Sequence, residues 1–423
     1  MEQIKCRIVT PMFSRGASYS FELSSQSIKG VLRFWFRAIA PTIIDIYTFE
    51  DTENLSDKEQ KRWNNEKYKG LKYLESLIFG SQERKAPFGL EVRTYGEPKT
   101  LGTFVEKNNK KGYKVQICES LKSLRYFLYG LYDENNKAVY EYLPPEARFS
   151  IFLHTRDENI KQIILNLLWL VSTFSGFGAK TRKGFGEFEI IDPSLDRNDY
   201  IGAIENCKEA IREFVKKHNS KSNIRLRLQP TKFEEMPEFP NFADCMILKS
   251  PAKKVKNVIE ALKEAANVYI ELKKQLRYSD GDCVRHIKNH LVNSRKAKIH
   301  VPTAILGLPL QYQGKGFQGR KVVVFSSLKE LKIDKGRIDK GRKASPLFIS
   351  AHRKDEKNWE LIFLLMRSNV TSEKDGSLIA EVIKDKESQD FEVKVFVKEK
   401  EDYEKVTSIL KTQGFEELQG GYS

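Results

Sequence analysis

Glycines and cations alternate over one short segment, Gly176 to Gly186 (GFGAKTRKGFG). Glycine lets a backbone approach a ligand closely, lysine and arginine attract phosphates, and a phenylalanine ring can stack on a base. These residue types predict a cradle for the phosphates and bases of a nucleic acid. Its candidate residues are Gly176, Phe177, Gly178, Lys180, Arg182, Lys183, Gly184 and Phe185. The alternative is an ordinary glycine-rich turn into a strand, which three cations within four residues disfavour.

This segment matches neither GxxxxGK[ST] nor GxGxxG, so the Walker and dinucleotide-binding mechanisms do not apply to it. A GxGxxG string does occur from Gly314 to Gly319, but it lies between two predicted strands and does not open a helix. We interpret that string as a basic loop and expect no nucleotide cofactor.

Three further cations share one edge of a predicted helix, Ile28 to Ile39. Lys29, Arg33 and Arg37 lie at positions i, i+4 and i+8, about 6 Å apart, which is comparable to the phosphate spacing of an extended single strand. The opposite face of the helix is apolar and belongs to the core. The stripe is therefore either an RNA contact or the solvated edge of a core helix. Weaker RNA-binding candidates in the second half of the chain are Arg320, Arg342 and Lys343.

Histidines suggest two other chemistries. Cys283, His286 and His290 lie at i, i+3 and i+7 on one helical face and could supply metal ligands. No fourth ligand or catalytic glutamate has the required spacing, so a basic surface helix is the preferred interpretation. His154 could act as the general base of a metal-independent endoribonuclease. We expect no metal and no catalytic residue, and RNA processing by cleavage is the alternative function.

The composition also favours a nucleic-acid partner. The 423 residues include 73 lysines and arginines against 57 acidic residues, a formal charge of +16, and this surplus makes a polyanion the expected partner. The five scattered cysteines form no CxxC pair and predict no disulfide framework. The longest apolar stretch, Ile160 to Phe174, is too short and too interrupted to span a membrane. We therefore expect a cytoplasmic protein that binds no membrane.

Strands and helices must alternate to position these residues. In the first half, strands are expected at Ile4–Val9, Gly89–Thr94, Arg148–His154 and Phe185–Ile190, and helices at Ser27–Ala40 and Glu158–Phe174. This order is the split-βαβ, or ferredoxin-like, arrangement. In that arrangement the basic loop should lie beside the N-terminus of the first helix.

The second half repeats the alternation of strands and helices, although its strand order cannot be derived. The predicted fold class is α+β, with two tandem ferredoxin-like (RRM-like) domains and helical insertions. The first domain covers residues 1–195, with a helical insertion near 45–85. The second covers residues 196–423, including a connecting segment at 196–225.

Several strings resemble the RAMP superfamily of CRISPR RNA proteins. They are Thr10-Pro11 after the first strand, SIKGVLRFWFRA (27–38), FGS (79–81) and GFGAKTRKGFGEFEI (176–190). Within the superfamily they are most similar to the family of subunit one of the type III-B Cmr effector complex. ILGLPLQY (305–312) and GRKASPLFI (341–349) are similar to strings in the second domain of that family.

The resemblance implies two RRM-like domains in a ribonucleoprotein of antiviral defence that holds a CRISPR RNA. The implied partners are CRISPR RNA, target single-stranded RNA and other Cmr or RAMP subunits, with this subunit near the 3′ end of the guide. In that family target cleavage is assigned to a different, repeated backbone subunit. The resemblance therefore implies RNA binding without catalysis.

Overall fold

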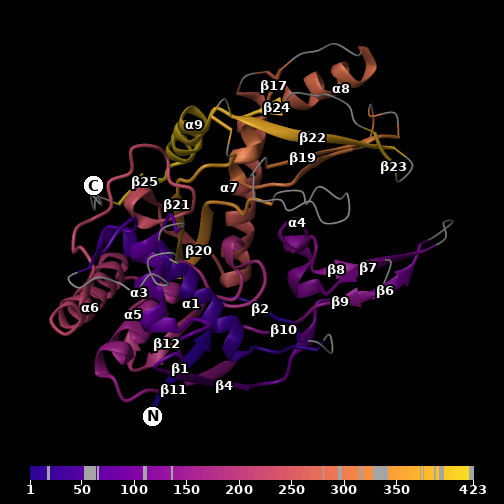
Figure 1. The fold of residues 1–423 in the computed structure, drawn as a ribbon. Coiled ribbons are helices and arrows are strands. Elements are labelled where there is room, and N and C mark those ends of the chain that lie inside the picture. Colours follow the sequence, from indigo (N-terminus) through magenta and orange to yellow (C-terminus); the bar gives the residue numbers. More distant parts are fainter. Residues whose placement is uncertain are drawn as a thin grey trace.

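The structure of the chain is a computed structural model. It describes residues 1–16, 20–51, 63, 66–107, 112–134, 137–279, 281–293, 298–313, 315, 317, 319–326, 342–371, 373–374, 376–384, 387–389 and 395–418. No helix among these residues is both long and apolar enough to cross a membrane. The elements form a mixed α+β architecture of helices and several sheets (Figure 1).

The first sheet has four main strands, whose neighbours are all antiparallel. They are β1 (Glu2–Ile8), β4 (Gly89–Tyr95), β11 (Arg148–His154) and β12 (Phe188–Asp192), in the order β12-β1-β11-β4. Counted along the chain this order is 4-1-3-2, as the sequence pattern predicts. Alternation along β1 buries Ile4, Cys6 and Ile8 against the helices that cover one face.

Two helices cover that face, α1 (Ser25–Ile39) and α5 (Glu158–Phe174). The Ser24 side chain caps α1 by accepting a hydrogen bond from the Ser27 amide, and Asp157 caps α5 in the same way. Helix α6 (Tyr200–Asn219) then packs against α5 and occupies most of the expected connecting segment.

The second sheet has the same strand order. Its main strands are β15 (Cys245–Lys249), β20 (Leu347–Arg353), β21 (Asn358–Met366) and β25 (Glu416–Glu417), arranged β25-β15-β21-β20 with antiparallel neighbours, and β16 (Lys253–Lys254) also pairs with β21. Helices α7 (Val258–Tyr278) and α9 (Glu399–Thr412) belong to this half. The order is again 4-1-3-2, which the sequence could not reveal.

The second sheet is buried on both faces. Leu347, Ile349 and Ala351 of β20 join the core formed with α7 and α9, whereas Phe348 joins the core of the first half and contacts Trp35 of α1. Antiparallel sheets often expose one face, but this one lies between two helical layers. The nearly continuous apolar run of β21 (NWELIFLLM) follows from this position (Figure 1).

A third sheet is inserted into the second half, with β22 as its longest strand. Its strands are β17 (Ile299–His300), β18 (Leu310–Tyr312), β19 (Lys321–Phe325), β22 (Ser377–Lys384), β23 (Glu387–Gln389) and β24 (Val395–Phe396), and helix α8 (Cys283–Asn293) precedes them. The sequence pattern also predicts a strand at Phe391–Val397, and residues 391–394 of that prediction lie outside the described residues.

The first half contains two insertions. The one expected near 45–85 has helix α3 (Lys69–Phe79) and a short strand β3 (Glu50–Asp51), which pairs with β14 (Ile224–Arg225), while residues 52–62 and 64–65 of that prediction lie outside the described residues. A second insertion lies between β4 and β11. The sequence pattern predicts one of its strands, at Lys114–Cys118, which the structure places at Tyr113–Ile117, and none of its other elements. Its elements are β5 (Lys99–Thr100), β6 (Gly102–Glu106), β7 (Tyr113–Ile117), the 3₁₀ helix η2 (Glu119–Leu124), α4 (Arg125–Leu128), β8 (Tyr132–Asp133), β9 (Ala138–Val139) and β10 (Glu141–Leu143). Figure 1 shows its hairpins β6–β7 and β8–β9 extending away from the body of the molecule.

A buried ion pair joins the two halves. Glu187, next to the glycine-rich loop, is fully buried and accepts a 2.7 Å hydrogen bond from Arg197 and a 3.0 Å bond from the Ala351 amide of β20. Arg197 donates in turn to the carbonyl oxygens of Ser172 and Ala351, both at 3.1 Å. Burial raises the pKa of Glu187 to about 7, although the positive charge of Arg197 opposes the rise. The pair provides hydrogen-bond partners for the amide and the carbonyl of Ala351 at the edge of β20, and it holds the second sheet against the first half.

Replacing Glu187 with alanine should lower the free energy of unfolding by about 3–5 kcal/mol, because Arg197 would stay buried without a carboxylate. Urea denaturation measures this change. The matched control is Glu189→Ala, which removes a partly exposed carboxylate paired with Arg7 and should cost about 1 kcal/mol or less. Equal losses in the two variants would contradict a joining role for Glu187.

The same pair predicts a dependence of stability on pH. The folded-state pKa of Glu187, about 7, lies above the ordinary value of 4.5, so the folded protein binds the extra proton between these two pH values. Stability relative to the Glu187→Gln variant should therefore fall as the pH rises from about 4.5 to about 7. Denaturation of both proteins across this range tests the sign, and a difference that grows with pH would refute it.

Candidate nucleic-acid interface

The glycines of the loop between α5 and β12 allow the chain to fold closely onto itself. A Cβ atom on Gly186 (φ +73°) would collide with the carbonyl oxygen of Phe177, and one on Gly178 (φ +91°) would collide with that of Phe13. The Ala179 amide also donates a 2.7 Å hydrogen bond to the Phe13 carbonyl. These glycines are thus required for close contacts within the protein, whereas the sequence suggested close approach to a ligand.

The two phenylalanines of the loop belong to the core. Phe177 is 1% exposed and stacks on Phe188 with the ring centroids 4.7 Å apart, and Phe185 is fully buried against Phe13. The expectation that these rings stack on bases is wrong for this structure, because protein atoms already cover both of their faces.

Two cations of the loop bridge the halves of the protein. Arg182 donates a 2.6 Å hydrogen bond to the Ser345 carbonyl, and its guanidinium lies 4.7 Å from the ring centroid of Phe348. The Lys183 ammonium lies 3.0 Å from the ring centroid of Tyr269 on α7 and is buried with no hydrogen-bond partner among the described residues. Burial lowers the pKa of Arg182 to about 10 and that of Lys183 well below its ordinary value. Both charges are therefore costly to the folded state.

Lys180 is the more accessible cation of the loop. Its backbone is left-handed (φ +65°), and its partly exposed side chain donates a 2.6 Å hydrogen bond to the Tyr129 carbonyl. A lysine ammonium has three donor hydrogens, so this one retains capacity for a phosphate oxygen.

Two lysines from the second half complete a group of cations. The cation cluster, as we name it, consists of Lys180, Arg182, Lys183, Lys273 and Lys343. After burial, the main causes that lower the pKa of Lys183 are the charges of Lys273, Lys180 and Arg182. Lys343, whose ammonium donates to the Glu238 carbonyl at 2.9 Å, has its pKa lowered by burial to about 8.

Carboxylates do not neutralise this cluster. Among the described residues, none of its five members forms an ion pair within 4.0 Å, although Glu238 and Glu399 act on Lys343 from a greater distance. Like charges held together in a partly buried site repel one another, and a bound polyanion would relieve that repulsion. The cluster therefore has the electrostatic properties of an anion-binding site.

The cations of α1 serve mainly to hold α3. Arg37 forms two hydrogen bonds with Glu75, at 2.6 and 2.7 Å, and this contact raises the pKa of Arg37. Arg33 donates to the carbonyl oxygens of Phe79 and Gly80 at the C-terminal end of α3. These contacts favour the structural interpretation of the stripe over free phosphate contacts.

Lys29, the third cation of that stripe, lies 4.8 Å from the ring centroid of Phe88. The glycine-rich loop contacts α1 through Arg182, which lies 5.4 Å from the ring centroid of Phe34. This contact is in the C-terminal half of the helix, whereas the sequence suggested proximity to its N-terminus.

Comparison with known proteins identifies the family. The model of the RAMP superfamily matches residues 5–189. The curated CRISPR system Cmr subunit Cmr1-2 of Pyrococcus furiosus is 30% identical over 192 residues, which cover 43% of this chain and 90% of that protein. The chain belongs to the RAMP superfamily and is a homologue of Cmr1.

A further curated relative and a solved structure, both from the same organism, are similar over longer stretches. Cmr1-1 is 25% identical over 232 residues, so the alignment covers 52% of this chain and 59% of that relative. The crystal structure of Cmr1 in its apo form has a TM-score of 0.50 at 14% identity and covers 99% of this chain and 98% of its own. The fold of this chain is therefore the Cmr1 fold along its whole length.

The outer face of the first sheet, which an RRM would use for RNA, carries paired charges in this RAMP protein. Lys5 pairs with Asp192 at 2.8 Å, Arg7 pairs with Glu146 and Glu189, and another pair joins Arg93 to Glu91. Because carboxylates neutralise these cations, the face is a weaker candidate for a polyanion than the cation cluster.

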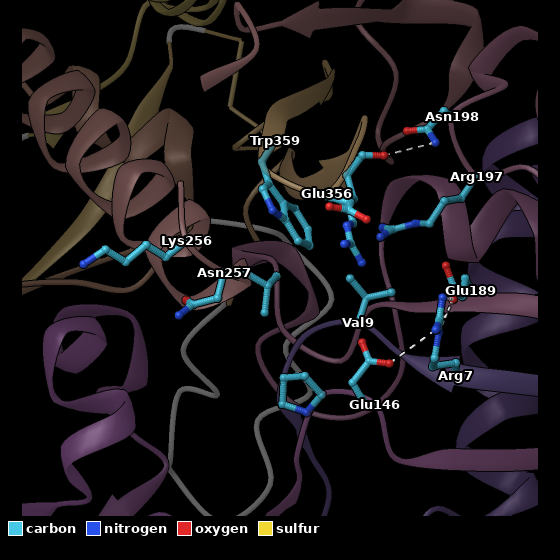
Figure 2. Close-up of a pocket in the computed structure, with 13 residues that line it drawn as sticks. Arg7, Val9, Glu146, Glu189, Arg197, Asn198, Lys256, Asn257, Glu356 and Trp359 are labelled. Atoms are coloured by element: carbon cyan, nitrogen blue, oxygen red, sulfur yellow. Dashed lines mark hydrogen bonds and ion pairs between the residues drawn. The ribbon is translucent and has the colours of Figure 1, made fainter. Parts of the chain in front are cut away.

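A pocket of about 300 Å³ lies between that face and the turn joining β20 to β21 (Figure 2). It is lined by residues of both charges. The cations are Arg7, Arg197, Lys256 and Arg353, and the carboxylates are Glu146, Glu189 and Glu356. Figure 2 shows Arg7 directed toward Glu146 and Glu189, and this mixed lining does not favour a polyanion.

The remaining predicted residues lie elsewhere. Arg342 is exposed next to Lys343, and Arg320 precedes β19 in the third sheet. His154 is 46% exposed on its side chain, with its Nε2 atom 4.0 Å from a Glu91 oxygen on the outer face of the first sheet. Within the described ranges no three histidine, cysteine, aspartate or glutamate side chains gather as a metal site, and the side chain of His290 lies outside those ranges.

We predict that Lys183 lowers the stability of the folded protein and strengthens its binding to RNA. Lys183→Met keeps an unbranched side chain against Tyr269 but removes the buried amino group, and it should raise the free energy of unfolding by roughly 1–3 kcal/mol. RNA affinity should fall in the same variant. Urea denaturation and fluorescence anisotropy measure the two effects.

The control for the effect of Lys183→Met on stability is Arg37→Met, which breaks the ion pair with Glu75 and should lower the free energy of unfolding. Destabilisation by Lys183→Met of the same size would show that Lys183 is an ordinary structural contact.

Proposed function

We propose that this chain is a non-catalytic RNA-binding subunit of a type III-B Cmr effector complex in the cytoplasm. In this proposal the cation cluster holds the backbone of single-stranded CRISPR RNA or target RNA near the 3′ end of the guide. The observation that carries the proposal is the cluster itself, where Lys180, Arg182, Lys183, Lys273 and Lys343 lie together without an ion pair to a described carboxylate.

Two ferredoxin-like domains in tandem, residues 1–195 and 196–423, form part of this proposal. The strand orders β12-β1-β11-β4 and β25-β15-β21-β20, each with two accompanying helices, support it. The cluster draws residues from both halves, so the RNA would lie across their junction.

Other Cmr and RAMP subunits are the proposed protein partners. The relatives from Pyrococcus furiosus are named as Cmr subunits, and the chain aligns with 90% of one and 59% of the other. In RNA-guided complexes base pairing with the guide reads the sequence, while protein contacts the backbone. A cluster of cations without a base-specific pocket suits that division. The proposal assigns no catalytic step to His154.

Binding by the cluster predicts an altered salt dependence. Lys180→Gln combined with Lys273→Gln removes the two partly exposed lysines and should weaken binding to single-stranded RNA of any sequence. The slope of log affinity against log salt should decrease by about 0.7 for each lost phosphate contact. Anisotropy titrations at several salt concentrations give this slope.

Lys5→Gln with Lys161→Gln is the matched control, because these lysines pair with Asp192 and Glu2. It should leave the slope nearly unchanged. If both double variants lower the slope equally, the RNA is held by general surface charge and the proposed site is wrong.

Affinity should also depend on pH in a range where ordinary lysines do not titrate. Lys343, with a pKa of about 8, loses its proton as the pH rises from 7 to 9, and the cluster then attracts phosphate less strongly. RNA affinity at constant salt should therefore fall over this range. Lys343→Arg keeps its charge and should flatten the profile, whereas a flat profile in the unmodified protein would contradict this role of Lys343.

A further inference from the structure

Two exposed tyrosines, one on α4 and one directly after it, lie beside the cation cluster. Tyr129 is 68% exposed and Tyr126 is 47% exposed. A tyrosine ring normally gains stability by burying its apolar faces, so two exposed rings in one short segment are unusual in a well-packed region. Both tyrosines are therefore accessible to a ligand.

The exposure does not reflect loose packing of the segment. Phe127 and Leu128, which lie between the two tyrosines in sequence, are 2% and 0% exposed, and the ring centroid of Phe127 lies 5.8 Å from that of Tyr269 on α7. Leu121 and Leu124 of η2 are buried as well. One side of the segment is thus anchored in the core, while Tyr126 and Tyr129 remain exposed.

Contacts join these tyrosines directly to the cluster. The Tyr129 carbonyl accepts the 2.6 Å hydrogen bond from Lys180. The ring centroid of Tyr126 lies 6.5 Å from that of Tyr269, whose face carries the Lys183 ammonium. The partly exposed Lys180 thus lies directly beside Tyr129, while Tyr126 is joined to the cluster through the buried Tyr269 and Lys183, where the insertion of the first half meets α7 of the second.

We propose that Tyr126 and Tyr129 form a stacking platform for unpaired bases of single-stranded RNA whose phosphates bind the cation cluster. The platform rests on the proposed function and extends it from the backbone to the bases. Aromatic rings stack on any base, so the platform adds affinity without sequence preference. It takes the role that the sequence suggested for Phe177 and Phe185.

The charge around the rings favours RNA over a protein partner. Lys180, Lys183 and Lys273 lack ion pairs with described carboxylates, so a polyanion complements the surface. The base faces must be free to stack, which a duplex does not allow, so the ligand is single-stranded.

The test compares two probes that share negative charge but differ in bases, a single-stranded RNA oligonucleotide and polyphosphate. Tyr126→Ala with Tyr129→Ala in the full chain should weaken RNA binding by about fivefold or more per ring and leave polyphosphate binding and the RNA salt slope unchanged. Tyr95→Ala with Tyr278→Ala is the control, because these tyrosines are 47% and 50% exposed but lie outside α4. Tyr129→Trp should retain affinity, and RNA should quench its fluorescence.

The outcomes separate the platform from the proposed function. If the Tyr126 and Tyr129 variant binds RNA normally while Lys180→Gln with Lys273→Gln weakens both probes, the platform is wrong and the backbone site stands. If the lysine variant leaves both probes unaffected, the proposed function itself fails. Loss of docking to other Cmr subunits with normal RNA affinity would make the tyrosines a protein contact and overturn the platform.

Discussion

The buried pair between Glu187 and Arg197 is the contact on which the arrangement of the two halves depends. It joins the strand that follows the glycine-rich loop to the otherwise unpaired edge of β20. Because β20 is the edge of a sheet buried on both faces, its backbone groups need partners that water cannot supply. The carboxylate and the guanidinium provide them for the amide and the carbonyl of Ala351, and the loop beside them is thereby held at the junction.

This junction explains why the loop combines structural and electrostatic roles. Arg182 and Lys183 pack on aromatic rings of the second half, so they fix the interface while their charges remain uncompensated. The repulsion among these cations and the loss of their hydration both lower the stability of the folded state. The empty site destabilises the folded protein, and a bound polyanion would relieve that destabilisation. RNA binding would thereby stabilise the arrangement of the two halves.

Much of the first half could be predicted from its sequence, because burial alternates along β1, β11 is a short apolar run, and α5 has a recognisable N-cap in Asp157. The order of the second sheet could not, since β21 is apolar on both faces and the third sheet interrupts the chain. Lys180, Arg182 and Lys183 were found because they are close in sequence, but Lys273 joins them only through folding. Burial reversed the interpretation of Phe177 and Phe185, while the exposure of Tyr126 and Tyr129 leaves no signal in the sequence.

Lysine footprinting tests the central claim most directly. Amine acetylation of the full chain, with and without single-stranded RNA, can be read residue by residue by mass spectrometry. The account predicts that RNA protects Lys180 and Lys273, while Lys5 on the outer face of the first sheet reacts as before. Protection of Lys5 with unchanged reaction at Lys180 and Lys273 would place the RNA on the sheet face and contradict the account.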